Sequence, residues 1–294
     1  MTAILTGTGI WSGGLRFGPE DEACAAAAEA ERLGYSAVWV PDPGGEDLFP
    51  RLAALLAATS TITVATGILN LWMHEPAVVG ARYAELSAKH DGRLLLGIGV
   101  SHALIIDGTH PGEYRKPLAK MREYLEQLDA ADPPVPVEHR VLAALGPKML
   151  ELSRDRAAGA HPYLVTPEHT ANARAALGPD KLLAPEQKVI LETDPTRARE
   201  IAREALRLYF GLPNYVNNWL RYGFTQEDVA APGSDRLVDA LVAWGTEETI
   251  AARVAEHRDA GADHVTIQAL DGSERGMIAL PTQDWARLAS ALLK

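Results

Sequence analysis

The sequence has little of several features that define broad protein classes. It contains a single cysteine, Cys24, among 294 residues, which excludes an intramolecular disulfide framework. Its longest apolar stretches, such as residues 52–58, are far shorter than the ~20 residues that a membrane-spanning helix needs. Positive charge is also scarce, because 28 Lys and Arg stand against 39 Asp and Glu and leave a net charge of −11. We therefore expect neither a membrane nor a nucleic acid as partner.

Signals for metal binding and for export are missing as well. The histidines and acids show no H-x-x-x-H or comparable spacing, so we predict no metal site. The first residues, MTAILTGTGIW, carry no charged segment ahead of the apolar ones, unlike a secretory leader. We expect a cytoplasmic protein.

What the chain does have is an alternation of short β-branched or aliphatic runs with longer helical patterns. The runs predict strands at residues 4–10, 37–40, 62–69, 94–98, 141–145, 160–165, 188–192 and 264–268. The helical patterns cover residues 20–33, 48–58, 77–90, 114–130, 148–156, 168–177, 195–210, 247–260 and 283–293. This order is typical of a parallel α/β protein.

Two parallel α/β folds fit such an order, a closed barrel and a doubly wound sheet. A dinucleotide-binding sheet needs G-x-G-x-x-G after its first strand, but here residues 7–12 read GTGIWS and lack the third glycine. We therefore predict a (β/α)8 TIM barrel formed by residues 1–294 as one domain. The spacing is broken at residues 208–244, which we interpret as an insertion between strands seven and eight, with a helix at residues 213–222.

Several polar and glycine residues fall where predicted strands end, which in a barrel is the face that carries the site. Asp42 ends the second strand, and Gly67-Ile68 end the third. The fourth strand finishes in Gly97-x-Gly99. Glycine at such a position lets a flat ligand approach the backbone.

Histidines and aromatic residues supply candidates for chemistry and for pocket walls. His102 follows the fourth strand, and His74 precedes the helix after the third; imidazole titrates near neutral pH and suits proton transfer. His110 and His161 are weaker candidates. The aromatic residues that fall at strand ends are Trp11, Trp72 and Tyr163, and we expect Trp11 and Trp72 to line a substrate pocket.

The turn Gly146-Pro147-Lys148 is a candidate phosphate site. Gly146 exposes backbone amides, Pro147 begins a helix, and a helix N-terminus attracts anions. Lys148 adds a full positive charge. An ordinary turn between a strand and a helix would have the same sequence pattern, so the turn alone does not distinguish a phosphate site from such a turn.

Taken together, the motifs resemble the luciferase-like oxidoreductases, and in particular their actinobacterial branch that uses the deazaflavin coenzyme F420. The resemblance spans nearly the whole chain and rests on the order of these segments: GYSAVWVPD at 34–42, TGI at 66–68, HEP at 74–76, GRLLLGIG at 92–99, LGPKMLEL at 145–152 and GADHV at 261–265.

This resemblance implies roles that the residues alone do not. It implies a cis peptide between Gly67 and Ile68 against the middle ring of the cofactor, with Asn70 at the carbonyl edge of that ring. It implies that the cofactor phosphate lies on the turn at Gly146. The cofactor-binding set expected from it is Asp42, Gly67, Ile68, Asn70, Gly99, Ser101, Gly146, Lys148 and Tyr163.

Three departures bear on the substrate. Relatives that oxidise sugar phosphates have histidine directly after the strand-two aspartate and glutamate in place of His102, whereas this chain has Pro43 and His102. These differences argue against a sugar phosphate. The loop after strand four is shorter than in bacterial luciferases, which argues against long-chain aldehyde luminescence.

We therefore expect an F420-dependent oxidoreductase that transfers a hydride between the deazaflavin and a small organic substrate, with His102, and secondarily His74, handling the proton. One alternative is a two-component monooxygenase that uses FMN supplied by a separate reductase. Another is a barrel that binds cofactor without catalysis. In each case we expect a homodimer.

Overall fold

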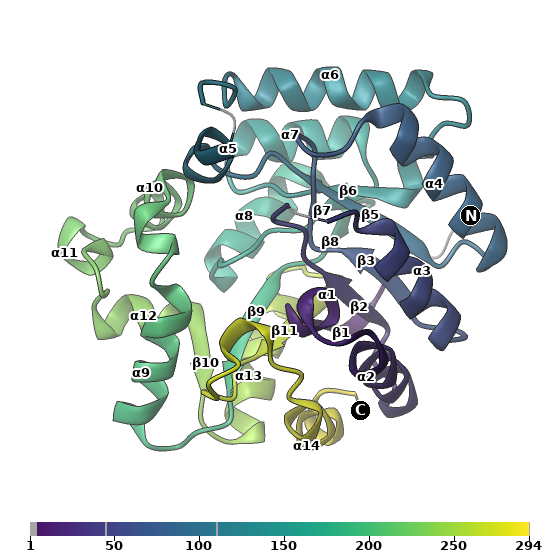
Figure 1. The fold of residues 1–294 in the computed structure, drawn as a ribbon. Coiled ribbons are helices and arrows are strands. Elements are labelled where there is room, and N and C mark those ends of the chain that lie inside the picture. Colours follow the sequence, from purple (N-terminus) through teal and green to yellow (C-terminus); the bar gives the residue numbers. More distant parts are fainter. Residues whose placement is uncertain (1–4, 45, 110, 294) are drawn as a thin grey trace.

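The computed structural model describes residues 5–44, 46–109 and 111–293, and its centre is a parallel β-sheet surrounded by helices (Figure 1). The strands are β1 Gly7–Trp11, β2 Ala37–Val40, β3 Thr63–Thr66, β4 Leu69–Asn70, β5 Leu94–Gly99, β6 Arg140–Leu142, β7 Gly159–Ala160, β8 Leu182–Leu183, β9 Glu186–Ile190, β10 Val242–Trp244 and β11 His264–Ala269. Their order is β10-β9-β11-β1-β2-β3-β5-β6-β7-β8, with β4 beside β5.

The sheet closes because β8 and β9 are consecutive parts of one extended segment, separated only by Ala184 and Pro185. β8 pairs with β7, and β9 pairs with β11. Backbone hydrogen bonds continue this pairing, since the Ala184 amide donates to the Ala160 carbonyl and the Glu186 amide donates to the Pro162 carbonyl, both at 2.9 Å. The (β/α)8 barrel that the alternation predicted is confirmed.

The helices follow the predicted order closely. They are α1 Gly14–Phe17, α2 Glu20–Leu33, α3 Phe49–Ala58, α4 Pro76–Lys89, α5 Ala103–Thr109, α6 Pro117–Ala130, α7 Pro147–Arg156, α8 Pro167–Leu177, α9 Pro195–Leu206, α10 Pro213–Arg221, α11 Gln226–Val229, α12 Asp235–Leu241, α13 Glu247–Asp259 and α14 Thr282–Leu292, with 3-10 turns η1 Val137–His139, η2 Tyr209–Gly211 and η3 Gly276–Ile278. Helix α2 has its predicted bounds, and Gly34 ends it in the left-handed region at φ 97°, which glycine favours.

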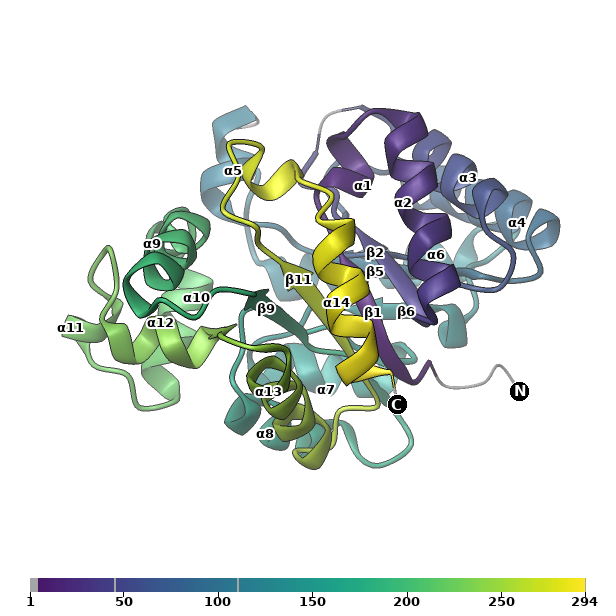
Figure 2. The same ribbon diagram turned by 90° about the horizontal axis from the view of Figure 1, so that it is seen from below.

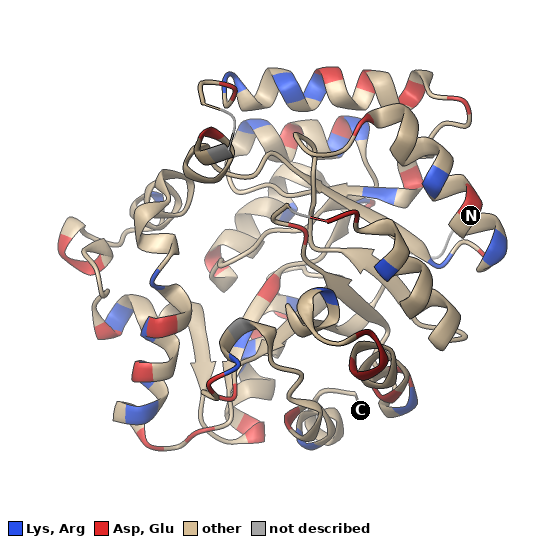
Figure 3. Ribbon diagram, viewed as in Figure 1, with Lys and Arg blue, Asp and Glu red and all other residues tan. Residues whose placement is uncertain are grey.

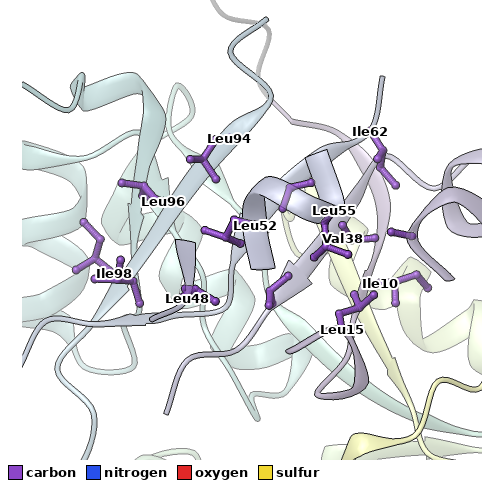
Figure 4. Close-up of a cluster of buried hydrophobic side chains, with 14 of the residues drawn as sticks. Ile10, Leu15, Val38, Leu48, Leu52, Leu55, Ile62, Leu94, Leu96 and Ile98 are labelled. Carbon is purple, nitrogen blue, oxygen red and sulfur yellow. The ribbon is translucent and has the colours of Figure 1, made fainter. Parts of the chain in front are cut away.

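The strands have two differently packed faces. On β5, the alternating residues Leu94, Leu96 and Ile98 point outward to the surrounding helices. Leu52 and Leu55 of α3 belong to the same hydrophobic cluster (Figure 4). The intervening positions face the barrel interior, where a separate cluster includes Trp39, Ala65 and Leu95. The interior of the barrel is therefore a packed layer, and any ligand has to bind above it.

The segment 208–244 holds η2, α10, α11, α12 and β10. Figures 1 and 2 show α9 to α12 grouped on one side of the barrel. Strand β10 pairs with β9 and was not predicted, because its three residues are too few to show a period. That this segment is an insertion, and that the chain is one domain, stay predictions.

Charged residues lie mainly on the outer helices, where both signs are intermixed (Figure 3). Among the described residues, no helix is both long enough and apolar enough to cross a membrane.

Candidate active site

A cavity of about 800 Å³ lies where the carboxyl ends of the strands meet. Residues that follow β1, β2, β3, β5, β6 and β7 line it, together with parts of α5, η2 and α10. The predicted site residues that line it are Trp11, Asp42, Gly67, Ile68, Gly99, Ser101, His102, Gly146, Lys148 and Tyr163. The fold thus brings together most of the residues singled out from the sequence.

Part of the cavity lining consists of glycines that have little room for a side chain. The Gly67–Ile68 peptide is cis, as the family resemblance implied. A Cβ on Gly67 would lie 2.5 Å from Nε1 of Trp11, and a Cβ on Gly99 would lie 2.4 Å from Cδ1 of Ile68. The Trp11 indole also donates to the Gly67 carbonyl at 3.0 Å. This flat surface suits a planar ligand.

Asp42 is buried beside the cavity and has a fixed orientation. Its Oδ2 lies 2.6 Å from Nε2 of His74, and its Oδ1 lies 3.7 Å from Nη2 of Arg16. Oδ1 has no hydrogen-bond partner among the described residues. The carboxylate therefore has an acceptor left over for an N–H or O–H group of a ligand.

Three predicted site residues do not line the cavity. His74 lies behind Asp42 and contacts it. The Asn70 side chain is turned inward, because its amide donates to the Pro43 carbonyl at 3.3 Å and its oxygen accepts from the Trp72 amide at 3.2 Å. The Trp72 indole donates to the Val100 carbonyl at 2.8 Å. Local hydrogen bonds thus hold these side chains away from the cavity.

His102 follows β5 and lines the cavity. Its ring contacts Tyr215, with centroids 5.3 Å apart, and its Nδ1 lies 3.4 Å from Nδ2 of Asn214. Burial lowers the pKa of His102 to about 4. At neutral pH the imidazole is uncharged, so it can accept a proton but has none to give as imidazolium. His110, the weaker candidate, lies outside the described residues.

The N-terminus of α7 forms one end of the cavity. Gly146 is its N-cap, Pro147 is its first residue, and no side chain caps it. A Cβ on Gly146 would meet nothing within 4 Å, so the turn opens into free space. Lys148 is exposed and lines the cavity beside this turn. Unfilled amides at a helix N-terminus, with a nearby ammonium, bind anions.

A second cation at this end was not predicted from the sequence. Arg221, the last residue of α10, also lines the cavity. His169 hydrogen-bonds through Nε2 to the Leu145 carbonyl at 2.9 Å, and the Arg221 charge contributes to lowering the pKa of His169. Arg221 therefore lies near the turn that begins α7. Only the fold could show this, because the two segments are about 70 residues apart in the sequence.

A buried polar cluster beside the cavity was not predicted from the sequence either. Lys188 on β9 is fully buried, and its ammonium donates to the Tyr163 hydroxyl at 2.6 Å, Gln268 Oε1 at 2.6 Å and Glu186 Oε1 at 3.1 Å. Tyr163 Oη also lies 3.0 Å from Tyr209 Oη. The predicted strand began at Lys188, so Glu186 and Gln187 lay outside it, whereas β9 begins at Glu186. A polar triplet beside a strand pattern is the signal that could have indicated it.

His161 contributes one more unused polar atom. Its Nδ1 donates to the Ala184 carbonyl at 2.7 Å, and its ring stacks on Trp39 with centroids 4.1 Å apart. Nε2 has no partner among the described residues. Since Nδ1 carries the proton, Nε2 is a bare acceptor at the cavity floor.

Known proteins resemble part of this chain in sequence. A sequence model of the family described as luciferase-like monooxygenase matches residues 2–131. Rv3520c of Mycobacterium tuberculosis, whose name refers to coenzyme F420-dependent oxidoreduction, is 30% identical over 120 residues, which is 40% of this chain and 34% of that protein. The alignment thus spans about a third of that relative's length.

Solved structures extend the likeness to the whole fold. An F420-dependent secondary alcohol dehydrogenase, in complex with an F420-acetone adduct, has a TM-score of 0.75 at 16% identity and covers 98% of both chains. The oxygenating constituent of 3,6-diketocamphane monooxygenase from Pseudomonas putida, in complex with FMN, has a TM-score of 0.71 at 13% identity with the same coverage. Residues 2–131 therefore resemble the luciferase-like monooxygenase family in sequence, and the whole chain shares its barrel fold with these solved structures.

Proposed function

We propose that the protein is an oxidoreductase that binds coenzyme F420 across its cavity and uses it to oxidise or reduce a small organic substrate. The observation that carries this proposal is the cavity itself, which has a flat glycine floor at Gly67 and Gly99 and a cationic, uncapped helix N-terminus at Gly146. A ligand with a planar ring and a phosphate-bearing tail fits both features of the cavity. The F420-dependent names among the relatives support the choice.

The residues present fit such a cofactor on their own chemistry. Asp42 Oδ1 and His161 Nε2 are buried acceptors without partners among the described residues, so both are open to polar atoms of a ring. At the other end, Lys148 and Arg221 flank the α7 amides, and we assign the phosphate to them. When bound, F420 supplies a two-electron hydride carrier.

The role we assign to His102 is to accept the proton that leaves the substrate. With a pKa lowered to about 4 by burial, the imidazole is neutral over the physiological range. A neutral imidazole favours the direction in which the substrate is oxidised, since it can take up a proton there. The rest of the wall excludes water, because Tyr114, Leu118 and Leu212 cover it with apolar surface.

The substrate enters past an apolar rim. Phe17, Leu208 and Ile278 all line the cavity and are 46%, 52% and 46% exposed. Exposed large apolar side chains at a cavity mouth favour a ligand with apolar surface of its own. We propose a small organic substrate of that kind, acted on by a cytoplasmic homodimer.

Titration of the purified protein with F420, followed by quenching of the cofactor's fluorescence, tests the assignment. We expect saturable binding of F420 and weaker binding of FMN under the same conditions. The runner-up, a monooxygenase that receives reduced FMN from a separate reductase, is favoured by the FMN-bound neighbour. Tight binding of FMN with none of F420 would establish the runner-up. Binding of F420 without turnover of any substrate would favour the non-catalytic barrel.

A further inference from the structure

The buried cluster around Lys188 has no part in cofactor binding as proposed above, yet it touches the cavity. Three rings that line the cavity surround the ammonium, whose Nζ lies 4.0 Å from the ring centroid of Tyr163, 5.6 Å from that of Tyr209 and 6.0 Å from that of Trp11. A lysine is seldom fully buried unless its charge has a use or a partner. Lys188 is 0% exposed.

The ion pair that neutralises Lys188 is oriented. Glu186 Oε1 accepts from the ammonium at 3.1 Å, and Glu186 Oε2 accepts from the Leu164 amide at 3.2 Å. On its other side the ammonium donates to the Tyr163 hydroxyl. The positive end of the pair therefore faces the cavity, and the carboxylate is held away from it by the backbone.

The hydrogen-bond directions in this cluster can be assigned. A lysine ammonium only donates, so Gln268 must present Oε1 to it. Tyr163 also lies 2.9 Å from Gln268 Oε1 and must donate there. Both lone pairs of the Tyr163 oxygen then accept, one from Lys188 and one from Tyr209.

Tyr209 is the member of the cluster with freedom to turn. If its O–H rotates into the cavity, Tyr163 keeps its bond from Lys188 and no buried group is left without a partner. Burial raises the pKa of Tyr163 and of Tyr209, so both hydroxyls keep their protons. Tyr209 can thus donate to an oxygen in the cavity, while Lys188 behind it favours negative charge there.

The position of the cluster matches the reacting end of the cavity. Trp11 contacts Tyr163 with centroids 5.3 Å apart and donates to the Gly67 carbonyl on the floor. Lys148 and Arg221 are assigned to the cofactor phosphate and do not take part in this cluster. An oxygen held by Tyr209 would lie on the side where the cofactor ring is proposed to rest.

We propose that Tyr209 binds the oxygen atom on the reacting carbon of the substrate, that Lys188 acts through Tyr163 to stabilise negative charge on this oxygen, and that the substrate is therefore an alcohol or the corresponding ketone or aldehyde. The inference rests on the proposed function. On oxidation, the C–H hydrogen leaves with its electron pair to the deazaflavin, the O–H proton leaves to neutral His102 or to water, and the C=O bond forms. Tyr209 stabilises the oxygen while it carries charge, and Lys188 is a positioning residue.

The test uses 4-nitrophenol without cofactor, since the ionisation of this phenol is read directly from its absorption spectrum. In the wild-type protein, we expect the pKa of bound 4-nitrophenol to fall by about 1 unit below its value in water, because a cation lies within reach of its oxygen. Tyr209→Phe should return that pKa to the value in water or above it, since the apolar cavity alone disfavours phenolate.

Tyr215→Phe is the matched control. Tyr215 lines the same cavity and packs edge-on against Tyr209, with centroids 5.1 Å apart, but within the described part of the chain its hydroxyl makes no hydrogen bond to the cluster. It should retain the lowered pKa. The double variant Lys188→Met/Glu186→Gln, which removes the ion pair without leaving an unpaired charge, should lose it as Tyr209→Phe does.

The result that overturns the proposal is a bound phenol with an unshifted pKa in the wild type, an equal shift in Tyr209→Phe, or no binding at millimolar phenol. Fluorescence titration of F420 with the same proteins separates this outcome from failure of the proposed function. Cofactor affinity should stay within a few-fold in Tyr209→Phe. If F420 fails to bind the wild type while the phenol pKa shift persists, only the proposed cofactor is wrong.

Discussion

The two sides of the barrel interior are filled by different kinds of residue. On β2, β3 and β5 the interior residues are Trp39, Ala65 and Leu95, which pack as an apolar cluster. On β9 and β11 they include Glu186, Lys188, His264 and Gln268, all buried and all hydrogen-bonded. The first side depends on shape, whereas the second depends on each polar group having a partner.

The difference shows where function constrains the fold. Apolar packing tolerates exchange of similar residues, because no single contact is decisive. A buried polar network is costly as soon as one member is lost, since its partner is then buried alone. A network of this kind next to a cavity indicates a use beyond stability, and the polar side is accordingly the side on which we place the reacting oxygen.

Acid should give the largest effect, and it should act through the histidines. Burial lowers the pKa of His102, His161 and His169 to about 4 and that of His257 and His264 to about 3. All five are neutral when folded but take up protons near pH 6.5 when unfolded, so the stability they confer is present above pH 6.5 and is lost as the pH falls toward 4 and 3. Urea unfolding at a series of pH values measures this loss.

A variant of a single histidine tests how much one buried imidazole contributes to the pH dependence of stability. His257 on α13 contacts Thr170 and Gln187 and lies away from the cavity lining. His257→Gln should reduce the slope of stability against pH by about one proton between pH 6 and 4. Stability that does not change between pH 7 and 4 would contradict the assignment of neutral buried histidines.

Breaking the ion pair should give the next largest effect. Lys188→Ala leaves the Glu186 carboxylate buried without its cation, and we expect a loss of about 3–5 kcal/mol in the free energy of unfolding. The double variant Lys188→Met/Glu186→Gln should recover much of that loss. Leu95→Ala on the apolar side should cost about 2–5 kcal/mol, with no partner substitution that restores it. Chemical denaturation measures all three.

His102 should matter for turnover and not for cofactor binding. We expect His102→Ala to lower kcat by about 10²-fold or more, because general acid–base groups contribute about 10²–10⁴-fold. F420 affinity, measured by fluorescence quenching, should stay within a few-fold. In the wild type, kcat should rise with pH through about 4 as the imidazole loses its proton. An unchanged kcat in the variant would transfer the role to Tyr209, His74, Asp42 or solvent.

Lys148→Ala should give the smallest effect, because the side chain is exposed. We expect a loss of about 1 kcal/mol in F420 binding, several-fold in affinity, which shrinks at high salt. A phosphate-free deazaflavin should be bound equally well by both proteins. Arg221→Ala is the companion variant at the same end of the cavity and should behave alike. Equal losses for both ligands would show that Lys148 only faces solvent.

The site could be predicted from the sequence wherever backbone position alone decides it. Glycines at Gly67 and Gly99, and the helix start at Gly146, have to lie at one face once the strands are parallel. The direction in which a side chain points was harder to predict from the sequence. Asn70 and Trp72 occur at strand ends as predicted, but hydrogen bonds to Pro43 and Val100 hold them away from the cavity.

The sequence by itself determined the elements and their order, because periodicity, glycine ends and proline starts are local. It did not determine how the barrel closes or what lies inside it. β8 and β9 form one segment only because β7 and β11 pair with it, and Glu186 and Lys188 are buried only because Tyr163 and Gln268 meet them there. Those contacts join residues far apart in the chain, so the tertiary structure alone could bring a buried charge to the cavity wall.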